Sequence, residues 1–455
     1  MSLQKICLVV DNPLRDLDGL VLLAWHFAQH NFQVWLVPMY DQSFDIRAIR
    51  PDFVLLNYVR NNNLQHVYAY LQEGIKVGVL DTEGTGGKTP EEFAKLVGSS
   101  GGAQHLDLYC TWGSSQATAL ETAGVVPADR ISITGCPRYD FCADPWRNAL
   151  PKPQIQPGYV LVNTNFPIVN PRYSAGSHDE FKTMLSAGFD AEFATQYIAD
   201  ARQANQGMVK LIDTLCERFP AQQFVLRPHP FESRDPYEGL SKHANFQIRQ
   251  EGTSLEWLNQ CSLLLHLNCS TAVEASMLGK PAISPAWLDT PALRVPGPHQ
   301  VSQHASSLLA LKELFAAPAP AKTQQIESIY HSIDGQSSAR TVHSVMQVLG
   351  QSASRSIGVP SPSLKSRLVW SIRRALGARL AMWVERKFAD PAFVQKKSSK
   401  LFTAEQVQPL LNRIEAVAPP SSLDTIASPA TKVTVVRPRL ASGNTICIQS
   451  SSVVN

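Results

Sequence analysis

The chain has 455 residues, of which 44% are hydrophobic, and this length predicts two or three domains rather than one core. Its 41 Lys and Arg against 38 Asp and Glu leave a net charge of only +3, which argues against a nucleic-acid partner. None of the eight cysteines forms a CxxC pair, so we expect buried free thiols in the reducing cytoplasm. Neither a signal peptide nor a membrane-spanning run of roughly 18 apolar residues is expected.

Short apolar runs alternate with helix-like segments between residues 5 and 134. The expected strands span 6–10, 34–37, 53–57, 77–80, 106–111 and 131–134, and the expected helices lie near 20–29, 66–72, 91–96 and 115–123. Continuous apolar strands separated by helices predict a parallel sheet that is covered on both faces. We assign residues 1–145 to this first, Rossmann-like domain, as the acceptor side of an enzyme.

The alternation restarts after a proline-rich stretch at 145–157, which we interpret as a linker. Strands are expected at 159–163, 223–227, 246–248, 262–267 and 282–284, and helices at 192–218, 254–259 and 270–278. We assign residues 146–350 to this second Rossmann-like domain, as the donor side. Two doubly wound α/β domains facing a cleft are the outline of the GT-B fold.

A C-terminal helical extension follows at residues 351–455, after two helical segments expected at 324–333 and 338–349. Residues 364–388 carry seven basic residues and one acid, and their apolar positions recur every three or four residues. This basic amphipathic helix suits an anionic membrane surface, although a helix packed on the core would show the same apolar stripe. The last ~35 residues, rich in Ser, Thr and Pro, are expected to be a mobile tail.

The first candidate site follows the strand at 223–227, where Arg227, Pro228, His229 and Pro230 are consecutive. In an α/β sheet, the loop after the carboxyl end of a strand faces the ligand crevice. Proline on both sides of His229 restricts the backbone, and a protonated imidazole there can bind a donor phosphate. A lone His-Pro dipeptide is otherwise a weak signal.

The second candidate follows the strand at 262–267, with Asn268, Ser270 and Thr271 at the start of a helix and Glu274 one turn later. Two hydroxyl groups and the backbone N–H groups at a helix start are suited to a phosphate. Ser270 could equally be a simple helix cap, and Glu274 could reach ribose hydroxyls or complement the helix dipole.

The third candidate is the acidic, glycine-rich turn after the strand at 77–80, which contains Asp81 and Glu83. A carboxylate at this sheet edge could act as general base on an acceptor hydroxyl, or could belong to a polar turn.

Other polar residues follow the first strand of each domain. Arg15, Asp16 and Asp18 could line the acceptor side, with helix capping as the alternative for Asp18, whereas Asn163 and Asn165 could bind a sugar or form a turn. His266, inside a strand, is expected to be packed rather than catalytic. No HExxH motif or Cys/His cluster is present, and no DxD spacing suggests a metal, so we expect neither a metal nor a cofactor besides the donor.

The order of these motifs, together with the segment Gly135–Asp140, resembles the bacterial surface carbohydrate biosynthesis proteins. These are similar to GT-B β-Kdo transferases of capsule and lipopolysaccharide assembly, and more distantly to bacterial sialyl- and polysialyltransferases. The resemblance implies that His229 contacts the donor phosphate and that Ser270 and Thr271 hold the phosphate of CMP. Glu83 matches the acid that serves the acceptor, although Thr82 replaces the acid expected before it.

The resulting hypothesis is a metal-independent glycosyltransferase that moves an ulosonic acid, Kdo or a sialic-acid-like sugar, from a CMP-activated donor to a growing surface polysaccharide. Arg227 would add positive charge beside the donor phosphate. The alternatives are a CDP-glycerol-type glycerophosphotransferase and a non-catalytic glycan-binding GT-B module. The expected location is cytoplasmic, at the inner membrane if residues 364–388 bind lipid.

Overall fold

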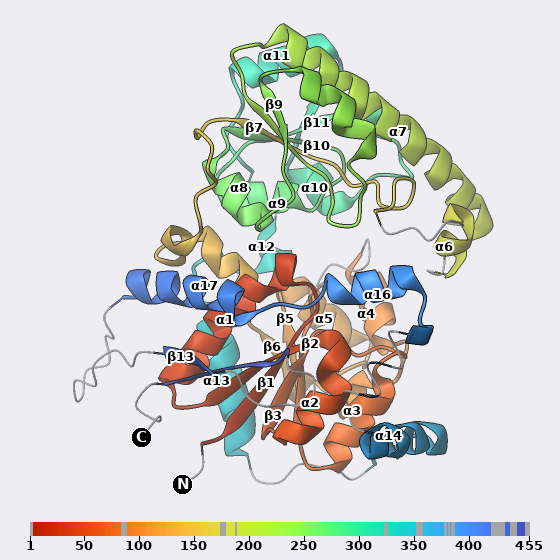
Figure 1. Cartoon of the computed structure of the whole chain (residues 1–455), viewed down its shortest axis with the longest axis vertical. Helices are drawn as coiled ribbons and strands as arrows, with labels where there is room; N and C mark the ends of the chain where they lie inside the picture. Colours follow the sequence, from red (N-terminus) through yellow and green to blue (C-terminus); the bar gives the residue numbers. More distant parts are fainter. Residues whose placement is uncertain are drawn as a thin grey trace. The chain divides into compact units, whose positions relative to one another are not determined.

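The computed structural model describes residues 3–82, 89–172, 179–186, 189–322, 326–351, 358–376, 380, 383, 387–419, 433–436 and 444–450. The chain divides into two compact units (Figure 1). Unit 1 comprises Met1–Leu150, Glu327–Ala389 and Lys396–Asn455, and unit 2 comprises Pro151–Ile326 and Asp390–Gln395.

Unit 1 contains an eight-stranded sheet, in the order β13-β14-β2-β1-β3-β4-β5-β6. Its parallel strands are β1 Lys5–Val10, β2 Gln33–Pro38, β3 Phe53–Leu56, β4 Lys76–Leu80, β5 Leu108–Thr111 and β6 Ile131–Ile133. This confirms the strands predicted between residues 5 and 134. Because β1 pairs with β2 on one side and β3 on the other, the strand order reverses between β1 and β3. Ligands of doubly wound sheets bind at such a switch point, outside the carboxyl ends of the strands.

The helices of unit 1 connect these strands. They are α1 Pro13–Gln29, α2 Gln42–Ile49, α3 Leu64–Gln72, α4 Pro90–Gly98 and α5 Ser114–Thr122. Helix α1 begins earlier than expected because Asn12 caps it: its Oδ1 accepts a hydrogen bond from the backbone N of Leu14 at 3.1 Å, and Pro13 occupies the first helical position. Asp18 therefore lies inside the helix, and its interpretation as a cap is wrong.

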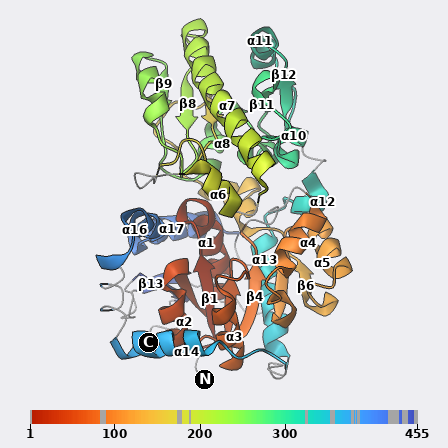
Figure 2. The ribbon, with the colours of Figure 1, turned by 90° about the vertical axis from the view of Figure 1, so that its right-hand side faces the viewer.

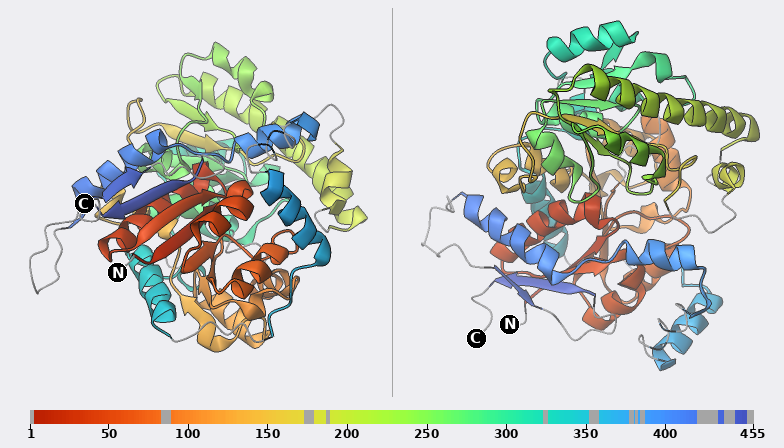
Figure 3. Two further views of the ribbon diagram at one scale, coloured as in Figure 1. Left: turned by 60° about the horizontal axis from the view of Figure 1, so that its bottom comes forward. Right: turned by 45° about the horizontal axis from the view of Figure 1, so that its top comes forward.

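The C-terminal part of the chain returns to unit 1 from Glu327 on, except for Asp390–Gln395, which belong to unit 2. Its elements are α12 Glu327–Tyr330, α13 Ser337–Gly350, α14 Leu364–Leu376, α16 Pro391–Ser398, α17 Ala404–Val417, β13 Val433–Val436 and β14 Ile446–Ser450. Strand β14 pairs antiparallel with β2, and α17 packs on α1 (Figure 3). The expected boundary at residue 350 is therefore wrong, and so is the expected mobile tail for residues 444–450, because Ile446 and Ile448 are buried in the sheet.

Unit 2 contains a six-stranded parallel sheet, in the order β12-β11-β10-β7-β8-β9, covered by the long helix α7 (Figure 2). The strands are β7 Val160–Asn163, β8 Phe224–Arg227, β9 Phe246–Ile248, β10 Leu263–His266, β11 Ala282–Pro285 and β12 Gln303–Ala305. The helices are α6 Glu180–Ser186, α7 Ala191–Arg218, α8 Ser254–Gln260, α9 Thr271–Met277, α10 Pro296–Val301 and α11 Leu308–Ala316. The strand order reverses between β7 and β10, which places the switch point of unit 2 there.

The first boundary also differs from the expectation, because the chain leaves unit 1 after Leu150 rather than at residue 145. Trp146 and Leu150, inside the expected linker, are buried, and Trp146 Nε1 donates a hydrogen bond to the carbonyl oxygen of Gly335 at 2.9 Å. All eight cysteines are free and buried, which confirms the expected buried thiols. Among the described helices, none combines the length and apolar character that a membrane crossing requires.

Replacing Ile448 with Ala tests whether β14 belongs to the core of unit 1. Ile448 is fully buried against the first sheet, so its truncation should lower the free energy of unfolding by about 2–5 kcal/mol. The matched control is Gln449→Ala on the same strand, whose half-buried side chain contacts Gln33 and should cost less than about 1.5 kcal/mol. Urea denaturation monitored by circular dichroism measures both, and equal effects would contradict the packing of β14.

Candidate functional site

The candidate donor residues lie at the carboxyl edge of the sheet in unit 2. Asn163, the last residue of β7, pairs in register with Arg227 on β8 and with His266 on β10. The loops that follow these three neighbouring strands therefore begin at one level of the sheet, at the switch point. This arrangement brings together His229, Asn163, Asn165 and the segment 268–271, which sequence analysis had selected from three separate places.

His229 presents one particular ring nitrogen to its surroundings. The backbone N–H of Phe231 donates a hydrogen bond to His229 Nδ1 at 3.2 Å. An acceptor nitrogen cannot carry a proton, so the neutral ring has its hydrogen on Nε2. A second proton on Nδ1 would face this N–H group, and the geometry therefore favours a neutral imidazole that donates from Nε2, rather than the protonated ring that we expected. Pro230 lies within this same turn, where it limits the backbone.

Arg227 contacts the loop before α8, whereas we expected it to add positive charge beside the donor phosphate. Its Nη1 and Nη2 atoms donate to the carbonyl oxygens of Glu251 and Gly252, at 2.5 and 2.9 Å, and its guanidinium lies 5.2 Å from the centre of the Trp257 ring. Burial lowers the pKa of Arg227 to about 10, so it remains charged at neutral pH. These contacts make Arg227 an anchor for the loop before α8.

Asn163 and the two hydroxyl residues form the centre of the edge. Asn163 Nδ2 donates to Thr271 Oγ1 at 2.9 Å, and Thr271 Oγ1 in turn contacts Cys269 Sγ at 3.1 Å. Asn163 is only 4% exposed, and its Oδ1 has no hydrogen-bond partner within the described structure. Ser270 is exposed and its side chain makes no capping hydrogen bond, so the simple-cap alternative is wrong. A buried acceptor without a partner is costly, and a bound ligand would satisfy it.

The other residues that we expected to bind the sugar donor, Asn268, Asn165 and Glu274, form hydrogen bonds with neighbouring protein groups. Asn268 adopts a left-handed conformation, with φ of 50°, and its Nδ2 donates to Asp289 Oδ1 at 2.7 Å. Asn165 Nδ2 lies 3.5 Å from the carbonyl oxygen of Asn268. The carboxylate of Glu274 accepts a hydrogen bond from Ser254 Oγ at the start of α8, which ties it to that helix rather than presenting it to a ribose.

Sequence analysis missed Glu232, which organises this edge. Glu232 is fully buried and accepts hydrogen bonds from Tyr237 Oη at 2.6 Å, Thr164 Oγ1 at 3.0 Å and the backbone N of Phe166 at 3.1 Å. Burial raises its pKa, while these hydrogen bonds act in the opposite direction. The carboxylate thus connects the loop after β7 with the turn of His229, but a single acid in an irregular segment gives little sequence signal.

His266 is packed, as we expected. It is almost fully buried; its Nε2 lies 2.8 Å from Ser302 Oγ, and its Nδ1 accepts from the backbone N of Cys269 at 3.4 Å. Ser302 Oγ donates to the carbonyl oxygen of Pro298 at 2.6 Å, so the ring donates to Ser302 and is a neutral connector between β10 and α10.

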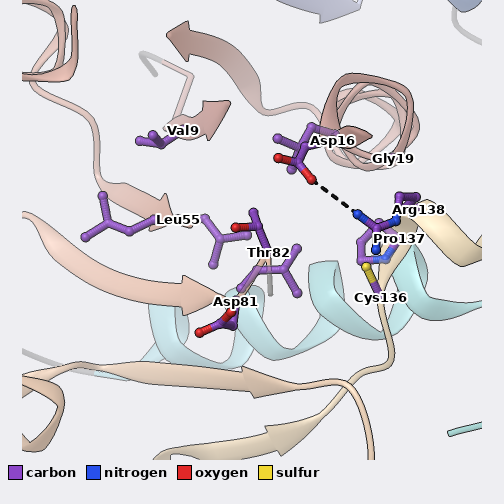
Figure 4. A pocket seen from close by; sticks show the side chains of 12 residues that line it. Val9, Asp16, Gly19, Leu55, Asp81, Thr82, Cys136, Pro137 and Arg138 are labelled. Carbon is purple, nitrogen blue, oxygen red and sulfur yellow. Dashed lines mark hydrogen bonds and ion pairs between the residues drawn. The ribbon is translucent and has the colours of Figure 1, made fainter. Parts of the chain in front are cut away.

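The switch point of unit 1 holds a small cavity of about 30 Å³, which is space for about one water molecule. Asp81, Thr82, Asp16 and Arg138 line it together with apolar residues from β1 and β3 (Figure 4). Asp81 is buried, and its Oδ2 accepts from Tyr109 Oη at 3.2 Å. The carboxylate of Asp81 therefore lies at this cavity with its orientation fixed by Tyr109. Glu83 lies outside the described residues.

An ion-pair network surrounds this cavity at the end of β1. Arg15 donates to Asp16 Oδ1 at 2.8 Å and to Asp11 Oδ2 at 3.1 Å, and Arg138 Nη1 lies 3.4 Å from Asp16 Oδ1. Lys400, from the C-terminal extension, pairs with the other oxygen of Asp11. Arg15 and Asp16, which we expected on the acceptor side, therefore belong to one ion-pair network. The C-terminal extension adds the cation of Lys400 to this network, which sequence analysis did not anticipate.

Helix α1 approaches this network closely. A Cβ atom on Gly19 would lie 2.6 Å from the backbone N of Arg138, so only glycine allows α1 to contact the segment Pro137–Cys142 as it does. This contact holds Asp16, on α1, beside Arg138.

One further group of side chains could ligate a metal ion in the described residues: Asp213, Glu217 and His243. Its central carboxylate is already paired, because Asp213 Oδ1 lies 2.8 Å from Lys242 Nζ and 2.7 Å from His243 Nε2. The group lies on α7 and after the turn 235–242, apart from the carboxyl edge of the sheet.

No protein-family model matches the chain, and no curated protein matches its sequence. Among solved structures, UDP-GlcNAc 2-epimerase of Methanocaldococcus jannaschii, in complex with UDP-GlcNAc and UDP, has 11% identity and a TM-score of 0.51, covering 76% of this chain and 100% of that chain. A putative UDP-N-acetylglucosamine 2-epimerase of Listeria monocytogenes has 12% identity and a TM-score of 0.49, covering 80% and 99%. The wall teichoic acid polymerase TagF has 11% identity and a TM-score of 0.46, covering 76% and 88%.

At such low identity the first of these likenesses shows the fold alone. Together with the two parallel, doubly wound sheets, it confirms the predicted α/β fold of the GT-B type.

The stability of unit 2 should fall in acid because of His266. Burial lowers the pKa of His266 to about 3, whereas the unfolded chain binds a proton at this ring below about pH 6.5. The stabilisation is therefore complete above pH 6.5 and is lost as the pH falls towards 3, and the loss amounts to about 2–3 kcal/mol at pH 4.5. Urea denaturation at pH 7.5 and 4.5 should give a smaller pH difference for His266→Gln than for the natural protein. An unchanged difference would contradict the buried neutral ring, and His343→Gln, at an exposed position of unit 1, is the control.

Proposed function

We propose that this protein is a glycosyltransferase whose unit 2 binds the nucleotide phosphate of an activated sugar and whose unit 1 supplies the carboxylate for the acceptor. The observation that carries the proposal is the convergence of His229, Asn163 and Ser270 at the switch point of a doubly wound sheet. Ligands of such sheets bind at this place. The GT-B-like fold is consistent with a sugar-processing enzyme but does not select the reaction.

The polar groups at the edge of unit 2 suit the departure of a phosphate. The neutral imidazole of His229 can donate from Nε2, and the hydroxyl of Ser270 is exposed. When the bond between the anomeric carbon and the phosphate oxygen breaks, both electrons pass to the phosphate. Hydrogen-bond donors placed there stabilise the developing charge without a metal ion.

Asp81 is the described carboxylate best placed to serve the acceptor. In the proposed reaction the acceptor hydroxyl forms the new bond to the anomeric carbon and passes its proton to a carboxylate of unit 1. The buried position of Asp81 beside the cavity and the hydrogen bond from Tyr109 support this role. Glu83, two residues later, remains the second candidate.

We propose CMP as the nucleotide and an ulosonic acid as the sugar, transferred to a growing bacterial surface polysaccharide. The motif order around His229, Ser270 and Thr271, and its resemblance to β-Kdo transferases, support this choice. We also propose a cytoplasmic location, which the eight free, buried cysteines support. The alternatives are a CDP-glycerol-type glycerophosphotransferase and a non-catalytic glycan-binding module.

His229→Ala should lower kcat for sugar transfer by about a hundredfold or more, because one donor to the developing phosphate charge is lost. Transfer from CMP-Kdo or CMP-sialic acid to a surface glycan, followed by release of CMP, measures this loss. His229→Gln should recover part of it, because a side-chain amide can also donate a hydrogen bond. The exposed His304→Ala in the same unit is the control and should keep full activity. Near-normal turnover of His229→Ala would remove His229 from the mechanism.

Thermal unfolding with CMP, CDP, UDP and CDP-glycerol should distinguish the three functions. A ligand at one hundred times its Kd stabilises a protein by about 2.7 kcal/mol, which raises Tm by several degrees for a unit of this size. We expect this rise with CMP, and a smaller one for Ser270→Ala. A response to CDP-glycerol alone would favour the glycerophosphotransferase, and no response to any nucleotide would favour the non-catalytic module.

A further inference from the structure

Helix α14 carries its apolar residues on the side that faces away from the protein. Leu364, Leu368 and Ile372 are 81%, 61% and 50% exposed, and Val369 is 39% exposed. With 3.6 residues per turn, positions four apart lie on one face of a helix, so the three residues form a continuous stripe. An amphipathic helix in a globular protein normally buries such a stripe in the core, and α14 does the opposite.

The orientation of α14 is fixed by Trp370, which lies on the opposite face of the helix. The ring of Trp370 stacks on His66 of α3, with 5.1 Å between ring centres, and the guanidinium of Arg47 on α2 lies 4.3 Å from its centre. Figure 1 shows α14 along the outer side of α3. The helix is thus held on unit 1 by an aromatic and cationic clamp, and the expected alternative of a core-packed apolar stripe is wrong for the described residues.

The segment that leads into α14 is also attached to unit 1. Ser363 N donates to Gln65 Oε1 at 2.6 Å, Gln72 Nε2 donates to Ser361 Oγ at 3.0 Å, and Val359 packs on the core of unit 1. The exposed stripe is therefore presented by an anchored helix.

The charge of α14 indicates what covers the stripe. Its 13 residues include Lys365, Arg367, Arg373 and Arg374 and no acid. The helical period places Lys365 within the apolar stripe, and both Lys365 and Arg367 are exposed. An apolar face combined with a wholly basic set of charges is the pattern of helices that lie in the interface of an anionic membrane, because the apolar side chains enter the acyl region while the cations meet lipid headgroups.

We propose that the outward face of α14, formed by Leu364, Leu368, Ile372 and Val369 with Lys365 and Arg367, is a docking surface for anionic phospholipid membranes. The Trp370 clamp holds this face outward, so membrane binding requires no rearrangement of unit 1. The inference does not depend on the sugar-transfer reaction, because vesicle binding is measured without substrate.

Co-sedimentation of the full-length protein with vesicles tests this surface. The protein should bind vesicles of equimolar phosphatidylcholine and phosphatidylglycerol, should bind vesicles of phosphatidylcholine alone much more weakly, and should dissociate as salt is raised. The double variant Leu368→Glu with Ile372→Glu should reduce the partition coefficient by about tenfold or more, because two apolar groups are removed from the face and two like charges to the lipid are added.

The matched control is Leu309→Glu, since Leu309 is an apolar side chain 66% exposed on α11 of unit 2 and carries no part of the proposed surface. It should bind vesicles as the natural protein does. All positions changed are exposed, so thermal unfolding should be unaltered in both variants. Unchanged binding of the double variant would overturn the proposal. So would a concentration-dependent dimer that the double variant dissociates while the natural protein ignores vesicles, because the face would then be an interface between copies.

Discussion

The buried carboxylate of Asp140, in the segment Pro137–Cys142, binds the start of α13 and so returns the C-terminal part of the chain to unit 1. Asp140 is 1% exposed and accepts hydrogen bonds from the backbone N atoms of Ser337 and Ser338, at 2.8 and 2.7 Å. Burial raises the pKa of Asp140, but these hydrogen bonds at the positive end of a helix favour its charged form. Arg340 strengthens the same contact by donating to the carbonyl oxygen of Thr134 at 2.9 Å. The chain that left unit 1 after Leu150 is thereby bound to it again.

Most of the described chain after α13 belongs to unit 1 as a consequence, apart from Asp390–Gln395. Strand β14 covers the edge of β2, which would otherwise offer unpaired backbone groups to another chain. Lys400 reaches the carboxylate of Asp11 at the end of β1, and Trp370 holds α14 against α2 and α3. The extension therefore completes the sheet, adds a charge beside the candidate acceptor site and displays an apolar helix face. These are three different uses of one returning segment.

The strength of each sequence signal explains what could be predicted. The parallel strands are continuous apolar runs that need no distant partner to be recognised, and both Rossmann-like sheets were predicted. Strand β14 contains a short apolar run amid Ser and Thr, and only its pairing with β13 and β2 makes it a strand. Similarly, the His-Pro motif marked the position of His229, whereas the tautomer depends on Phe231, the diversion of Arg227 depends on the loop at 251–252, and the role of Glu232 depends on Tyr237 and Thr164. These are tertiary contacts, which local patterns do not encode.

The two switch points differ in the chemistry of their charged groups. This difference bears on which unit binds the sugar donor and which binds the acceptor in the proposed reaction. In unit 2, the carboxylates of Glu232 and Glu274 are held by hydroxyl and backbone donors, while His229 offers a neutral donor. Such an edge can receive a phosphate without facing a competing negative charge. In unit 1, Asp81 accepts a hydrogen bond from a phenolic hydroxyl at a cavity, and Asp16 is balanced by two arginines. Such a carboxylate can accept a proton, which supports the proposal that unit 2 binds the donor and unit 1 the acceptor.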